Sequence, residues 1–183
     1  MNTIQVQGLH HITIHGSTRQ SAIDFWSGVL GMPFIMEQPN LGKPDESHLY
    51  FDPGDGRLIT VFTKEDRADD PKAKPREVGH VDHIAFRVSR AVYAQAGRRL
   101  EARGIEYKSF DRGFMDSIYF REPNGLLLEL SCYRFEAPEG VRETEVLARA
   151  HQLRREAGAE HIADEHLAEA LALLASERAA RGP

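Results

Sequence analysis

Three residues of the 183-residue chain combine metal-binding side chains with stretches that are typical of β-strands: His11, His83 and Glu129. The two histidines open similar alternating runs, and the glutamate stands between two leucines. A carboxylate inside an apolar strand is costly unless it is paired or bound to a cation. Two imidazoles and one carboxylate are the donor set of non-haem Fe(II) oxygenases, which leaves coordination positions open for substrate. Zinc uses His₂Glu as well, so the residue types alone do not select iron.

The elements that must position these residues occur twice along the chain. The runs around His11 and His83 align with an offset of 72 residues (83 minus 11). Each is followed by a stretch with helical spacing of apolar residues and then by three short strand-like runs, the last one after an Asp-Gly or Asn-Gly turn. The repeat predicts two βαβββ units, at about residues 6–63 and 79–134, and therefore an α+β fold.

The boundaries of the elements follow from local signals. We expect Ser17 and Ser89 to cap the two helices, and Gly31 and Gly104 to end them. A charged segment with two prolines, residues 64–78, is predicted to be the linker. The strands expected after the helices are residues 33–37, 48–51 and 57–62 in the first unit and 106–110, 117–120 and 126–132 in the second.

The composition changes after residue 136. The remaining chain is rich in Ala, Glu, Arg and Leu, and its apolar spacing predicts two helices separated by Gly158. We expect a paired βαβββ domain over residues 1–135 and a C-terminal helical extension over residues 136–183. The extension is interpreted as a packing or dimerisation element, and a role as a lid stays open.

Composition and charge exclude several classes of protein. The chain is 41% hydrophobic and 28% charged, which is ordinary for a globular protein, and it contains no apolar run long enough to span a membrane. Its N-terminus has no secretory pattern, and the single Cys132 excludes an internal disulfide, so a cytoplasmic location is expected. A net charge of −5 without a basic cluster argues against nucleic acid as a partner.

Three short motifs carry a family resemblance. They are His-Ile-Thr-Ile at 11–14, His-Ile-Ala-Phe at 83–86 and Pro-Asn-Gly-Leu-Leu-Leu-Glu-Leu at 123–130. Together with the paired units, they resemble the vicinal oxygen chelate superfamily, which includes glyoxalase I, fosfomycin and bleomycin resistance proteins, and extradiol ring-cleaving dioxygenases. The resemblance covers about residues 6–134. It implies a curved, incomplete barrel formed by the two units, with a metal inside.

Two stretches narrow the resemblance. Residues 9–14 and 111–123 are similar to the hydroquinone-type ring-cleaving dioxygenases. That similarity implies six site residues: the metal ligands His11, His83 and Glu129, and the substrate-site residues His10, Arg112 and Tyr119. On strand alternation alone, His10 would point to the face opposite His11.

Two features depart from that pattern. Members of the hydroquinone-type family are commonly about twice as long, with four units, and often carry a second histidine where this chain has Asp82. In addition, Thr60 stands in the first unit at the place that Glu129 takes in the second. A neutral residue there favours one metal site per pair of units and argues against the glyoxalase arrangement.

The expected function is an Fe(II)-dependent extradiol-type dioxygenase that acts on a catechol or hydroquinone and inserts both atoms of O2. Mn(II) is a possible substitute, no organic cofactor is expected, and a homodimer is expected. The resemblance implies that Arg112 holds an anionic oxygen and that Tyr119 or His10 manages protons. Two alternatives stay open: a glyoxalase-like lyase or isomerase using Zn(II) or Ni(II), and a non-catalytic drug-binding resistance protein. His48, which shares a face with Tyr50, either lines the cavity or ends its strand.

Overall fold

The computed structural model describes residues 3–181, so the outermost ends of the two expected domain ranges, residues 1–2 and 182–183, lie outside it. The described chain forms two compact units. The first runs up to Phe86 and adds residues 104–106 and 120–128. The second takes residues 87–103 and 107–119 and continues from Glu129 onward.

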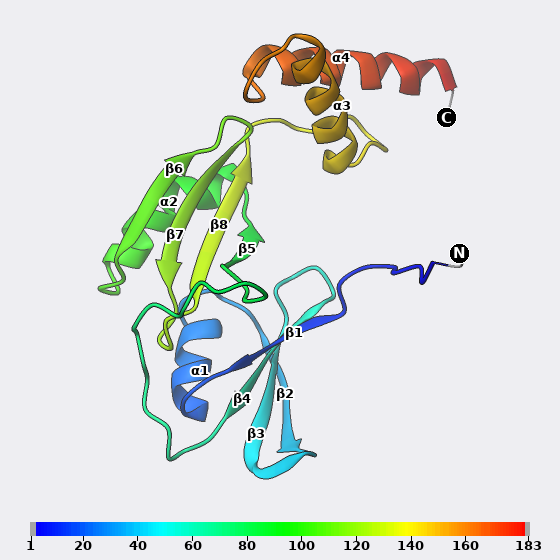
Figure 1. Cartoon of the computed structure of the whole chain (residues 1–183). Coiled ribbons are helices and arrows are strands. Elements are labelled where there is room, and N and C mark those ends of the chain that lie inside the picture. The colour runs from blue at the N-terminus through cyan, green and yellow to red at the C-terminus, as the bar shows by residue number, and fades with distance from the viewer. Residues whose placement is uncertain (1–2, 182–183) are drawn as a thin grey trace. The chain divides into compact units, whose positions relative to one another are not determined.

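The first sheet has four strands in the order β1-β4-β3-β2. The strands are β1 (His11–His15), β2 (Phe34–Asn40), β3 (Lys43–Phe51) and β4 (Leu58–Thr63). β1 runs parallel to β4, whereas β3 is antiparallel to both β4 and β2. The helix α1 (Arg19–Trp26) connects β1 to β2 and packs on one face of this sheet (Figure 1).

The two faces of the first sheet differ in chemistry. On the helix side, buried apolar residues pack under α1, and the rings of Trp26 and Phe51 lie 6.5 Å apart. The strand register places a different set on the other face, because residues paired across neighbouring strands share a face. That open face carries His11, Thr13, His15, His48, Tyr50, Thr60 and Phe62.

The second sheet repeats the pattern in the order β5-β8-β7-β6. Its strands are β5 (Ile84–Arg87), β6 (Tyr107–Asp111), β7 (Met115–Arg121) and β8 (Leu127–Tyr133). Between β5 and β6 in sequence lies α2 (Arg90–Glu101), which buries Ala96 and Leu100. The strand and helix order confirms the α+β prediction of two βαβββ modules.

The helix boundaries differ in part from the expectations. Ser89 caps α2 as predicted, accepting a hydrogen bond from the Val92 N–H at 3.2 Å. The cap of α1 is Thr18, not Ser17, and accepts from the Ser21 N–H. Both residues are good caps by type, but the hydroxyl of Ser17 donates instead to Asp69. α1 also ends at Trp26, because residues 27–30 form a separate turn before the Gly31 position.

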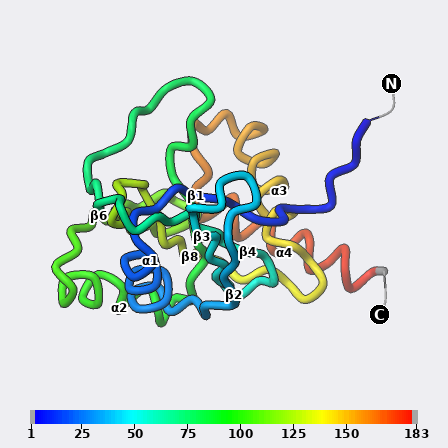
Figure 2. The backbone as a smooth tube through the Cα atoms, turned by 90° about the horizontal axis from the view of Figure 1, so that it is seen from below, coloured from blue at the N-terminus to red at the C-terminus, as the bar shows by residue number. Residues whose placement is uncertain are grey.

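Residues 64–83 contain no helix or strand and run as a long loop (Figure 2). Lys72 in this loop approaches the turn between β7 and β8 at Gly125. The φ of Gly125 is 82°, in the left-handed region, and a Cβ there would clash with the carbonyl oxygen of Lys72. Glycine is therefore required at this position for two independent reasons.

The C-terminal helices form the predicted hairpin. α3 (Glu143–Glu156) and α4 (Asp164–Arg181) lie side by side (Figure 1). They share a small core of four fully or almost fully buried residues: Val146, Ala150, Leu167 and Ala170. His166 is buried, and its Nδ1 accepts from the N–H of Ala163 at the start of α4. Within residues 3–181, none of the helices combines the length and apolar character that crossing a membrane requires.

Candidate metal and substrate site

Glu129 lies on β8 with only 2% of its surface exposed. Two serine hydroxyls donate to the same carboxylate oxygen, Oε1: Ser117 of β7 at 2.5 Å and Ser131 of β8 at 2.6 Å. Both donors are neutral hydroxyls, which orient the carboxylate and add no charge of their own. A buried carboxylate in such a setting fits a bound cation.

Arg112, Tyr119 and Phe110 form a cluster in the second unit. The guanidinium Nη2 of Arg112 donates to the Tyr119 hydroxyl at 3.3 Å. The same guanidinium lies 5.5 Å from the centroid of the Tyr119 ring and 5.1 Å from that of Phe110. The two rings meet edge-on, with centroids 5.6 Å apart.

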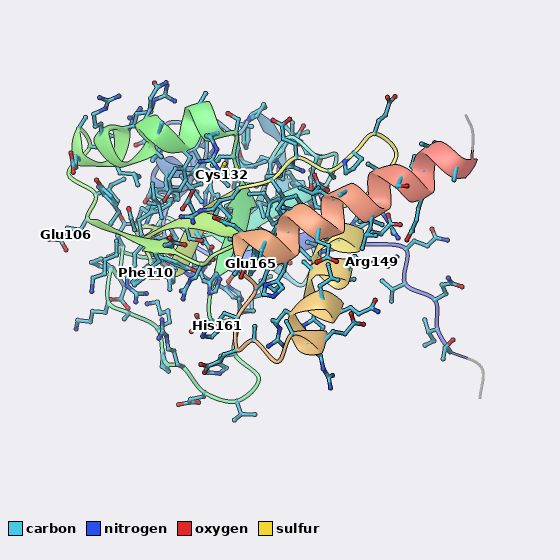
Figure 3. All side chains as sticks on the ribbon, turned by 90° about the horizontal axis from the view of Figure 1, so that it is seen from above. Glu106, Phe110, Cys132, Arg149, His161 and Glu165 are labelled. Carbon is cyan, nitrogen blue, oxygen red and sulfur yellow. The ribbon has the colours of Figure 1, made fainter. Side chains whose placement is uncertain are left out.

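The electrostatics of this cluster keep Arg112 charged. Its hydrogen bond to Tyr119, and to a smaller extent the negative charge of Glu129, raise the pKa of Arg112 above its usual value. The guanidinium is therefore a permanent cation that is electrostatically coupled to the buried carboxylate. Phe110 lies on β6 with 44% of its surface exposed (Figure 3). The sequence did not identify it as a candidate site residue. The available signal was its place near the end of β6, two residues before Arg112, which directly follows the strand.

His11 is the first residue of β1, and its neighbour His10 lies just outside the strand. The two Nδ1 atoms are 2.8 Å apart, so one imidazole donates a hydrogen bond to the other. The alternation argument, which put His10 on the opposite face, is wrong. It assumed a regular strand through His10, and the regular strand begins one residue later. The structure thus brings His10 and His11 together.

His83 directly precedes β5. Its Nδ1 donates to the Asp82 carboxylate at 2.9 Å, and Asp82 is also paired with Arg76 at 2.8 Å. The hydrogen bond to His83 lowers the pKa of Asp82, with a smaller contribution from the charge of Arg76. A carboxylate that holds Nδ1–H fixes the tautomer in which Nε2 has the lone pair, as is common for histidines that bind metals. The contact with Asp82 favours the tautomer that the predicted ligand role of His83 requires.

His48 and Tyr50 lie on the open face of the first sheet. The amide of Gln38 donates to the Tyr50 hydroxyl at 3.2 Å, and Tyr50 lies 2.8 Å from His48 Nδ1. Because the Tyr50 oxygen already accepts from Gln38, its own proton goes to Nδ1, and the His48 proton is then on Nε2. Burial, and next the charge of His11, lower the pKa of His48, so the ring is neutral at pH 7.

The first unit lacks a counterpart of Glu129. Thr60 is fully buried, and its hydroxyl donates to that of Thr13 at 2.9 Å. Two neutral hydroxyls satisfy each other there, and no charge is buried. The first sheet therefore holds a neutral hydroxyl pair at the place that corresponds to Glu129.

The predicted ligands are distributed over the two units. His11 and His83 lie in the compact unit that runs up to Phe86, although His83 opens the second βαβββ repeat, and Glu129 lies in the other compact unit. Among residues 3–181, no group of three or more His, Cys, Asp or Glu side chains is gathered as a metal site. The metal ligand set therefore remains a prediction. What the structure brings together is His10 with His11, Asp82 with His83, and Arg112 with Tyr119.

Comparison with known proteins defines the family. Residues 8–130 match the model of the Glyoxalase/Bleomycin resistance protein/Dioxygenase superfamily. The chain belongs to this superfamily, as the sequence motifs implied.

Three proteins with which the chain shares sequence or structural similarity illustrate the family. The Bacillus subtilis (strain 168) protein "Putative ring-cleaving dioxygenase MhqO" is 30% identical over 144 residues, which are 76% of this chain and 43% of the relative. A solved "putative dioxygenase" from Bacillus subtilis subsp. subtilis str. 168 is 27% identical, with a TM-score of 0.58 over 74% of this chain and 43% of that one. The fosfomycin resistance protein FosX of Listeria monocytogenes, solved with Mn(II), is 21% identical, with a TM-score of 0.52 over 69% of this chain and 92% of that one.

The chain thus spans less than half the length of the first two relatives and most of the length of the third. The superfamily includes proteins named as ring-cleaving dioxygenases and as fosfomycin resistance proteins, and the FosX structure contains Mn(II).

Proposed function

We propose that the protein is an Fe(II)-dependent ring-cleaving dioxygenase that acts on a catechol or hydroquinone and inserts both atoms of O2. The observation that carries the proposal is the second unit, where the buried carboxylate of Glu129 is coupled to the Arg112–Tyr119 pair beside the Phe110 ring. A carboxylate that suits a cation, in the same unit as a charged donor and an aromatic surface, fits an aromatic diol. The 30% identity to MhqO supports the same class of reaction.

His11, His83 and Glu129 would hold the metal in this proposal. Iron, when bound, supplies the Lewis acidity that lowers the pKa of a diol and the redox chemistry that joins it to O2. Asp82 would not bind the metal itself but would fix the tautomer of the ligand His83 through their hydrogen bond. The donor set of two imidazoles and one carboxylate also accepts Mn(II).

The remaining residues would act on the substrate. The permanently charged Arg112 would bind a phenolate oxygen, and Tyr119 would give or take a proton at a substrate oxygen. The Phe110 ring would offer an apolar surface to the aromatic ring. His10 shares a proton with His11 through the Nδ1 contact, so it is the nearest imidazole for proton transfer beside that ligand.

The test is anaerobic reconstitution of the full chain with Fe(II), followed by oxygen consumption against a panel of catechols and hydroquinones. We expect uptake with at least one diol, and its loss in Glu129→Gln. The control is Glu165→Gln, which changes an exposed carboxyl in the first turn of α4. A protein that holds stoichiometric iron and consumes no oxygen with any diol would overturn the proposal.

One observation favours a second candidate, a glyoxalase-like metal-dependent lyase or isomerase. The matched region makes up 92% of the FosX chain, which was solved with Mn(II), but only 43% of MhqO. This candidate predicts bound Zn(II), Ni(II) or Mn(II) in the purified protein and no oxygen uptake with diols. Metal analysis of the protein as isolated, combined with the oxygen assay, separates the two candidates.

The proposal includes a homodimer. β2 is an edge strand of the first sheet, and it exposes three consecutive large apolar residues, Phe34, Ile35 and Met36. Apolar side chains on an unpaired strand edge favour association. Light scattering on the full chain is expected to give twice the monomer mass of 20.6 kDa, and a monomer at all concentrations would contradict this part of the proposal.

A further inference from the structure

We propose that Ser117 and Ser131 are positioning residues that fix the orientation of the Glu129 carboxylate toward the metal. This inference rests on the proposed metal-binding role of Glu129. The two hydroxyls approach one oxygen, Oε1, at 2.5 and 2.6 Å. Distances of this size are those of charge-assisted O–H···O⁻ hydrogen bonds.

The two serines hold the carboxylate from different directions. Ser117 comes from the neighbouring strand β7, and Ser131 stands two residues after Glu129 on β8, on the same face. One contact limits rotation of the side chain away from β7, and the other limits it along β8. The two contacts at Oε1 therefore fix the plane of the carboxylate.

Burial makes the arrangement costly to replace. Ser117 is fully buried and Glu129 is 2% exposed, so water has little access to Oε1. If one hydroxyl is removed, the carboxylate oxygen loses a donor that solvent does not supply. The side chain then gains rotational freedom that metal binding must remove again.

The first unit shows that these serines are not a general feature of the fold. Glu129 corresponds to Thr60, which stands 69 residues earlier in the chain. The same offset relates Ser117 to His48 and Ser131 to Phe62. There the rings of His48 and Phe62 pack at a tilt of 41° with centroids 4.3 Å apart, and Thr60 pairs with Thr13. The two hydroxyls occur only in the unit that carries the carboxylate.

The test is Co(II) titration of the metal-free full chain, followed by visible absorption and by competition with a chelator. The variants are Ser117→Ala, Ser131→Ala and the double variant. We expect each single change to weaken Co(II) binding by about 10–100-fold, the usual effect of losing a partner of a metal ligand, and to alter the absorption bands. Ser131→Thr keeps a hydroxyl and is expected to retain the affinity of the wild type.

The matched control is Thr60→Val, which removes a buried hydroxyl from the sheet without the carboxylate and should leave Co(II) binding unchanged. Ser131 is only partly buried, so its alanine variant carries the test even if Ser117→Ala fails to fold. Wild-type affinity and spectrum in a folded Ser131→Ala would overturn the inference alone. A wild-type protein that binds no Co(II), or undiminished binding in Glu129→Gln, would overturn the proposed ligand set and this inference with it.

Discussion

The Nη2 atom of Arg112 donates a hydrogen bond to the Tyr119 hydroxyl at 3.3 Å, while its guanidinium plane also contacts the ring of Phe110. A planar guanidinium can hold a hydroxyl at its edge and an aromatic ring at its face at the same time, which a lysine ammonium does not reproduce. This contact holds the Tyr119 phenol against Arg112. The negative charge of Glu129 acts on the same guanidinium.

Arg112→Lys is therefore expected to lower kcat/KM for the diol. The loss is about 10–100-fold, the value of one hydrogen bond to a charged group. The measurement is steady-state oxygen uptake by the iron-loaded protein. Arg155→Lys on the exposed side of α3 is the control and should leave the rate unchanged. Equal rates for the two variants would contradict a substrate role for Arg112.

Asp82→Asn is expected to weaken metal binding, because an amide holds the Nδ1–H of His83 less strongly than a carboxylate does. Loss of such a partner lowers metal affinity by about 10–100-fold. Asp55→Asn is a matched control: both carboxylates are 52% exposed on their side chains, and each is paired with an arginine. Co(II) titration of the metal-free variants makes the comparison, and the same affinity in both would show that Asp82 does not orient a ligand.

His48 predicts a dependence of stability on pH. Burial lowers its pKa in the folded state, whereas the unfolded chain titrates at about 6.5. Below about pH 6.5 the unfolded state binds the additional proton, so stability falls as the pH decreases through that value toward the folded pKa. When the pH is lowered from 7.5 to 5.5, the Tm of the metal-free wild type should decrease. The decrease should be smaller in metal-free His48→Gln. Parallel Tm curves for the two proteins would contradict the assignment.

Gly125→Ala is expected to be severely destabilising. The alanine must adopt a φ of 82°, and its Cβ would meet the carbonyl oxygen of Lys72. Gly104→Ala is the control, because its φ of 69° imposes a similar strain of about 1–2 kcal/mol but no atom lies within 4 Å of the place that its Cβ would take. Urea unfolding should give a clearly larger loss for Gly125→Ala. Equal losses would mean that the loop around Lys72 moves away at little cost.

The sequence predicted the two βαβββ units because strand alternation, helical spacing and Gly-containing turns all repeat at nearly the same offset. Local signals failed where two residues compete, as at Ser17 and Thr18, which both suit a helix cap. Alternation failed for His10 because the regular strand begins at His11. Within the site, the side of Ser131 follows from alternation on one strand. Ser117 could not be found in this way, because its contact with Glu129 depends on how β7 and β8 pair, and the residue pattern leaves that register undetermined.

The central claim, that this chain uses a metal to cleave an aromatic diol with O2, is tested most directly by isotope labelling. The iron-loaded protein is supplied with ¹⁸O2 and the diol that supports oxygen uptake, and the ring-opened product is analysed by mass spectrometry. The account predicts that both labelled atoms appear in one product molecule and that Glu129→Gln forms none. A product with one labelled atom or none, or equal product formation by Glu129→Gln, would contradict it.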